Sequence, residues 1–308
     1  MDTTRTEPRL PGADSATWRH FALLPGFFVA GTGLLLQVAH PVVGAGVLHH
    51  SNFKQHPWKR ALRTHISTMR FVYGMQGGPH AEGARLREVH RSIKGVDGAG
   101  RRYHALHPDA YAWVHLTLAQ YVADTARWFY RPLSEAEAEQ MWQEFREIGK
   151  ALRLKDHQMP ATWSDAQRWF WEVVERELEA NQSTADVLES LSRPPKPARW
   201  IPSPLWQLLM RPLARLVLMT TAATLPAPLR ERLGLRWSST DQRRFERFAA
   251  LVRAAMRVLP EPLRYAPLAY VAMLRDRRSK APRTPSSVAQ NSWKRYRTPG
   301  RSRSWRVR

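Results

Sequence analysis

A long uncharged and mostly apolar stretch runs from Phe21 to Leu48. At about 20 residues per bilayer crossing it is long enough to span a membrane. However, it is interrupted by Pro25, Gln37, His40, Pro41 and five glycines. The residue before a proline is disfavoured in the helical region, so we predict a helix over residues 31–39 that breaks at His40-Pro41. This pattern favours a buried helix–turn–helix over a membrane span.

Apolar positions spaced three and four apart predict a series of further helices. Pro57 is suited to begin a helix that runs to about Tyr73. The next covers Ala81–Ile93, where Leu86, Val89, His90 and Ile93 form one apolar stripe. Asp109 is the predicted N-cap of the next helix, which runs to residue 129. Similar patterns cover residues 109–129, 134–152, 164–178, 184–191, 205–218 and 240–259. No segment shows a convincing strand alternation, so the predicted fold is all-α in a single domain.

The two ends of the chain differ from this pattern. Residues 1–18 are polar and are predicted to form a flexible arm, while residues 19–278 form the helical domain. Residues 279–308 are rich in Pro, Ser and Arg and have too little apolar content to fold. From Arg275 to Arg308 there are twelve Lys or Arg and one acid, so this segment carries half of the formal net charge of +22. The tail is suited either to bind phosphates or anionic lipid head groups, or only to solubilise the chain.

Composition excludes several classes of function. The chain has no cysteine, which rules out disulfides, iron–sulfur clusters and thiolate-ligated haem. Net charge is the only feature that suggests nucleic acid, and there is no recognition motif, so we expect no specific nucleic-acid partner. The N-terminus has acids and a proline before any apolar run, so we predict no secretory signal. We expect a cytoplasmic protein, with peripheral contact to an anionic membrane as an extension of this prediction.

Histidines and cations gather in a region without acids. Between Asp14 and Glu82 there is no Asp or Glu, and the histidines there include His40, His49, His50, His56, His65 and His80. A segment that is first apolar and then cationic suits a buried site for a large, partly anionic ligand. The alternative is a core helix followed by a basic surface helix.

Five segments in order resemble one family, the MpaB-type oxygenases and latex-clearing proteins (rubber oxygenases). They are LLLQVAHPVVGAGVLHHS, the cluster Arg60, Arg63 and Thr64, VHRSIKG, YHALHPDAYAWVHLTL, and LPAPLRERLGL followed by WSSTDQRRFERFA. The resemblance covers roughly Arg19 to Arg278. It implies a helical, globin-like core that holds haem b and cleaves carbon–carbon double bonds with dioxygen.

The resemblance also implies roles for individual residues. His90 matches the axial ligand of the haem iron, and Arg60, Arg63 and Thr64 match the opposite edge of the site. His115 either lines the pocket or packs in the core. Some relatives have a Lys that ligates iron where this chain has Arg63, which offers no lone pair. The acidic base of the relatives has no counterpart upstream of Arg60, so His40 or His49 is a candidate for proton transfer.

These observations support two functions of different class. The first is a haem-b-dependent oxygenase that uses dioxygen on an apolar, unsaturated small molecule, with Arg60, Thr64 and His40 as catalytic residues. The second is a non-catalytic protein that holds haem or lipid in the same cavity and docks to anionic membrane through its basic tail. Bound haem and turnover of an olefin would distinguish the first from the second.

Overall fold

Helices form almost all of the regular structure in the computed structural model, which describes residues 11–51, 57–198 and 200–280. The α-helices of the described residues are α1 (Ala16–Phe21), α2 (Ala30–Ala39), α3 (Pro41–His50), α4 (Pro57–Val72), α5 (Gly78–Arg91), α6 (Pro108–Phe129), α7 (Glu135–Ala151), α8 (Trp163–Arg176), α9 (Gln182–Ser192), α10 (Ser203–Thr224), α11 (Ala227–Arg232), α12 (Ser239–Val258) and α13 (Pro267–Lys280). Three short 3-10 turns complete the set: η1 (Leu24–Phe28), η2 (Asp156–Gln158) and η3 (Glu261–Arg264). The predicted all-α, single-domain fold is confirmed.

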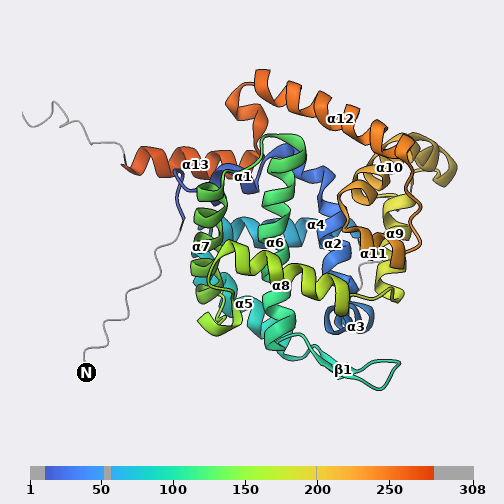
Figure 1. Cartoon of the computed structure of the whole chain (residues 1–308), viewed down its shortest axis with the longest axis horizontal. Helices are drawn as coiled ribbons and strands as arrows, with labels where there is room; N and C mark the ends of the chain where they lie inside the picture. The colour runs from blue at the N-terminus through green and yellow to red at the C-terminus, as the bar shows by residue number, and fades with distance from the viewer. Residues whose placement is uncertain (1–10, 52–56, 199, 281–308) are drawn as a thin grey trace, which may run out of the picture.

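Helix α6 crosses the middle of the molecule, and the other helices surround it (Figure 1). Its fully buried residues include Trp113, Leu116, Val122 and Phe129. They recur at helical spacing around several sides, and this is the pattern of a helix that is buried all round. The indole N–H of Trp113 donates a hydrogen bond to the carbonyl of Leu36 at 2.9 Å, which joins α6 to α2.

The predicted break at His40-Pro41 is confirmed. His40 has extended backbone angles between α2 and α3, and the two helices meet at 98°. No single helix in the described ranges is long and apolar enough to cross a membrane, whereas α2 and α3 pass that test only as a bent pair.

Local structure differs from the prediction at several places, and α13, for example, lies after the last predicted helix. Residues 94–96 (β1) and 102–104 (β2) pair as an antiparallel hairpin, because strands of three residues are too short to show alternation. Helix α6 begins at Pro108, with His107 rather than Asp109 as its N-cap. The flexible arm does not reach residue 18: Ala13 and Thr17 donate backbone hydrogen bonds to Asp276 and Glu144, both at 2.8 Å. These acids are distant in sequence, so no local pattern could reveal the contacts. The part of the predicted tail that follows Lys280 lies outside the described residues.

A buried carboxylate joins α4 to α5. The side chain of Glu82 accepts hydrogen bonds from Ser67 at 2.5 Å, from Arg70 at 3.4 Å and from Arg85. Desolvation by burial raises the pKa of Glu82, but the hydrogen bonds from Arg85 and Ser67 outweigh it, so the pKa falls below its usual value. The contact therefore fixes how the two helices lie against each other.

We expect Glu82→Gln to lower the free energy of unfolding by about 1–3 kcal/mol, because charge-assisted hydrogen bonds at a buried site are lost. Urea unfolding at neutral pH measures the loss. Glu88→Gln is the matched control, since the Glu88 side chain is exposed on the same helix. Equal stability of the two variants would contradict a structural role for Glu82.

Candidate functional site

His90 lies in the last turn of α5 and is half-buried. Its ring meets that of Tyr111 edge-on, with 6.1 Å between the centroids. Its Nδ1 atom is buried and has no hydrogen-bond partner among the described residues. Burial lowers the pKa of His90, and the charges of Arg60 and Arg85 lower it further. The imidazole is therefore neutral at neutral pH and offers a lone pair, as a metal ligand must.

The apolar stripe predicted around His90 is only partly covered by the core, against which Leu86 packs. Leu86 and Ile93 are half-buried, and Val89 is 50% exposed. Helical spacing identifies a common face but not what covers it.

Arg60 lies near His90, and its position is fixed by a hydrogen bond. Its Nη1 donates to the hydroxyl of Ser51, just after α3, at 2.9 Å. Arg63 and Thr64 are exposed on the same half of α4, where the described residues show no contact between them and His90. The structure thus brings together two of the predicted residues, Arg60 and His90.

Several apolar side chains are exposed on the helix ends that meet in this region. They are Leu48 at the end of α3, Trp58 and Leu62 in the first half of α4, and Val89 near the end of α5. Large apolar groups on a surface mark a place where a ligand or partner binds. Together with Arg60, they provide the apolar and cationic surroundings that a flat apolar group with carboxylate arms requires.

His40 belongs to a second polar group beside the start of α6. Its Nε2 lies 3.5 Å from the carboxylate of Glu177, the C-cap of α8. Burial lowers the pKa of His40 to about 4, and the charge of His107 acts in the same direction. Burial raises the pKa of Glu177, and the nearby Asp109 raises it further. Sequence reasoning missed Glu177 because it lies more than 130 residues after His40.

His115 is buried between α6 and α7. Its Nε2 lies 2.7 Å from the carbonyl oxygen of Phe145, and this nitrogen must donate because the carbonyl can only accept. A Cβ on Gly149 would lie 3.1 Å from the same nitrogen, so there is no free space on that side. Only Nδ1, which is buried without a partner, remains available for the predicted role in cofactor binding.

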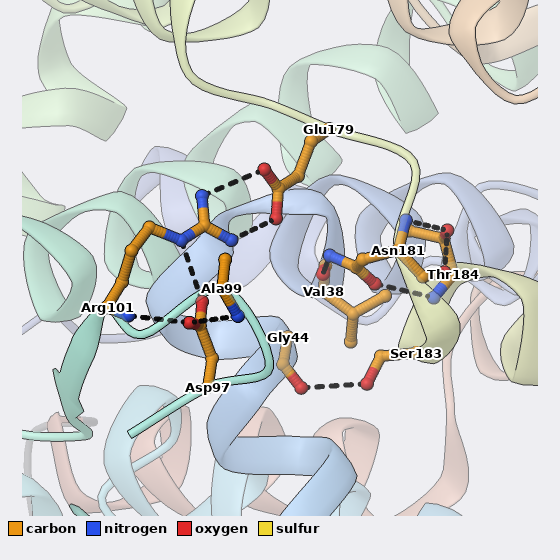
Figure 2. Close-up of polar contacts among 9 residues, drawn as sticks. All are labelled: Val38, Gly44, Asp97, Ala99, Arg101, Glu179, Asn181, Ser183 and Thr184. Carbon is orange, nitrogen blue, oxygen red and sulfur yellow. Dashed lines mark hydrogen bonds and ion pairs between the residues drawn. The ribbon is translucent and has the colours of Figure 1, made fainter. Parts of the chain in front are cut away.

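The hairpin that follows His90 is fastened to α3 and to the start of α9. Tyr103 of β2 holds its hydroxyl 2.8 Å from Nδ1 of His49 and 3.1 Å from Nε2 of His50. Figure 2 shows Arg101 bonded to Asp97 and, through two hydrogen bonds, to Glu179. A cavity of about 140 Å³ lies beside these residues and reaches Leu48. His49, proposed for proton transfer, is therefore held by Tyr103.

The comparisons with known proteins identify relatives of most of the chain. Residues 18–254 match the family model described as "ER-bound oxygenase mpaB/B'/Rubber oxygenase, catalytic domain". The uncharacterized protein Rv2237 of Mycobacterium tuberculosis and the uncharacterized protein Mb2261 of Mycobacterium bovis are each 28% identical over 231 residues. The alignment covers 74% of this chain and 87% of each relative. No solved structure matches the chain significantly.

Proposed function

The chain belongs to the family of ER-bound oxygenase mpaB/B' and rubber oxygenase catalytic domains, and from this premise we propose that it is a haem-b-dependent oxygenase acting on an apolar, unsaturated small molecule. The observation that carries the proposal is the His90 imidazole: it is neutral, its Nδ1 is buried without a partner, and Arg60 is close enough to lower its pKa.

Each residue of the site would make a different contact with the cofactor. His90 would bind the haem iron, and Tyr111, which meets its ring edge-on, would fix the plane of the imidazole. Arg60 is held by its hydrogen bond to Ser51. Its positive charge would lie beside a haem propionate or a polar oxygen of the substrate. Leu62 and Val89, which are exposed on the protein alone, would lie against an apolar face of the cofactor. Arg63 and Thr64 would lie at its edge, and Nδ1 of His115 would be the nitrogen available for a supporting role.

Haem b supplies the activation of dioxygen, which the side chains of this protein cannot provide. Cleavage of a carbon–carbon double bond by one molecule of dioxygen gives two carbonyl groups, so the reaction balances without an external reductant. The protein orients the double bond, keeps water away and handles the proton.

We assign proton transfer to His40 together with Glu177. The relatives' acid has no counterpart in the sequence before Arg60, but Glu177 brings a carboxylate to within 3.5 Å of His40. Its raised pKa makes the Glu177 carboxylate a stronger base than an ordinary surface acid, although the side chain is half-exposed. His40, whose pKa is about 4, is then the neutral partner that orients it.

The test is an absorption spectrum of the full chain produced with ample haem precursor, followed by oxygen uptake on an isoprenoid olefin. A Soret band and uptake that depends on the olefin would support the proposal. A colourless protein that consumes no oxygen after haem is added would contradict it. A haem-containing protein without turnover would favour the non-catalytic alternative.

We expect Arg60→Gln to raise the pKa of His90, since a nearby positive charge is removed. Histidine NMR titration of the haem-free protein measures the change. Arg63→Gln serves as the matched control on the same exposed half of α4. If both substitutions raised the pKa of His90 equally, Arg60 would not lie closer to His90 than Arg63 does.

A further inference from the structure

Helix α10 exposes a row of leucines on its first half. Leu205, Leu208 and Leu209 are spaced three and four apart, so they share one face, and Leu208 and Leu209 are each 68% exposed. Nine residues are two and a half turns, so Ala214 and Val217 lie on the face opposite Leu205 and Leu208. Both are buried. The leucine row therefore points away from the body of the protein. Helix α10 itself lies at the right-hand side of Figure 1.

The first turns of α10 are fixed in place. The indole of Trp206 and the amide of Gln207 both donate hydrogen bonds to the carbonyl of Pro194, at 2.7 and 3.2 Å. The indole of Trp58 donates to the next carbonyl, that of Pro195, at 2.8 Å. The exposed leucines are thus held on a fixed helix, next to the end of α4 that carries Arg60.

The charges in the sequence on either side of the leucine row are all positive. From residue 190 to 230 the sequence contains no Asp or Glu. Arg211 and Arg215 are exposed on the flank of the leucine row, and Trp200, directly before α10, is 83% exposed. Leucines on one face, cations at its flank and a tryptophan at its edge are the features of a helix that lies in a membrane interface.

We propose that the first half of α10, with Trp200, docks the protein onto anionic membranes by inserting its leucines among the lipids. An anionic lipid surface complements the cations, and a long arginine stem can follow the leucines into the interface while its charge stays at the head groups. A second copy of this chain would bring the same cations against them. The protein's own segment 281–308 is basic as well and would be repelled. The inference does not depend on the proposed haem chemistry.

The chain offers a clean test because it has no cysteine. Leu208→Cys places a single environment-sensitive nitrobenzoxadiazole dye on the proposed face. Leu251→Cys on α12 is the matched control: Leu251 is also 68% exposed on an arginine-rich helix, but α12 carries acids as well, Asp241 in its first turn and Glu246 after it. With phosphatidylcholine–phosphatidylglycerol vesicles, the dye at position 208 should brighten several-fold and shift to the blue, while the dye at 251 should not. Phosphatidylcholine vesicles alone should give little response.

Other occupants of the face give different results, and each overturns the proposal. A response without vesicles that grows with protein concentration indicates a second copy. A response without vesicles that disappears on truncation after Lys280 indicates the tail. Equal brightening at 208 and 251 indicates contact that is not specific to α10.

A sedimentation assay of unlabelled full-length protein distinguishes insertion of the leucines into the lipid from electrostatic attraction to the anionic head groups. Leu208→Asp with Leu209→Asp should weaken binding to the anionic vesicles about tenfold or more, because two exposed leucines that would insert into the lipid are lost. Leu251→Asp with Val258→Asp should leave binding unchanged. If truncation after Lys280 alone abolishes vesicle binding while the α10 variant binds normally, the tail and not α10 makes the contact, and the proposal fails.

Discussion

Haem is expected to be lost, or retained at less than about a tenth of the wild-type content, when His90 is changed to Ala, because the substitution removes the proposed protein bond to iron. Folding should persist, because His90 is only half-buried and the large buried side chains of α6 are untouched. The pyridine haemochrome assay gives the haem content, and circular dichroism gives the helical content. Added imidazole should restore part of the Soret band.

His80→Ala is the matched control, since His80 is exposed on the same helix. It should keep full haem content. His40→Ala should keep haem as well and lose activity, which separates the proposed ligand from the proposed proton-transfer group. Full haem content with an unchanged Soret band in His90→Ala, together with haem loss in His40→Ala, would show that the ligand was assigned to the wrong histidine.

Much of the fold is predictable because the helices have local signals in the sequence. Pro57 begins α4, the pair His40-Pro41 separates α2 from α3, and the Ser134–Glu137 capping box begins α7. Each of these is a signal of a few adjacent residues. The hairpin was missed because strands of three residues are too short to show alternation. The order of residues 13–18 was missed because it depends on contacts between distant segments, such as Ala13 with Asp276.

Only part of the candidate site could be predicted from the sequence, because the rest depends on contacts between segments that are distant in the chain. The neighbourhood of Arg60 and His90 follows from two adjacent helices joined through Glu82. The pairing of His40 with Glu177 does not, since it requires knowing that the end of α8 lies beside the bend between α2 and α3. A search for an acid near Arg60 in the sequence was therefore bound to fail, although the folded protein has one beside His40.

His115 should make the folded state sensitive to acid. Burial lowers its pKa from 6.5 to about 4, although the hydrogen bond to the carbonyl of Phe145 acts in the opposite direction. Between these two values the unfolded chain binds a proton at this residue and the folded chain does not. Stability is then present in full above about pH 6.5 and falls as the pH is lowered towards 4. Because a pKa difference of one corresponds to about 1.4 kcal/mol, the loss is on the order of 3 kcal/mol.

We therefore expect His115→Gln to flatten this dependence. Glutamine can still donate a hydrogen bond to the Phe145 carbonyl but does not titrate, so the variant is less stable than the wild type at pH 7 and closer to it at about pH 4.5. Urea unfolding at the two pH values measures both differences, and other titrating groups such as His40 contribute equally to the two proteins. His80→Gln, at an exposed position on α5, should show the wild-type dependence. An unchanged dependence in His115→Gln would mean that His115 is not held neutral in the folded protein, and the one nitrogen left for a role at the cofactor would then carry a proton instead of a lone pair.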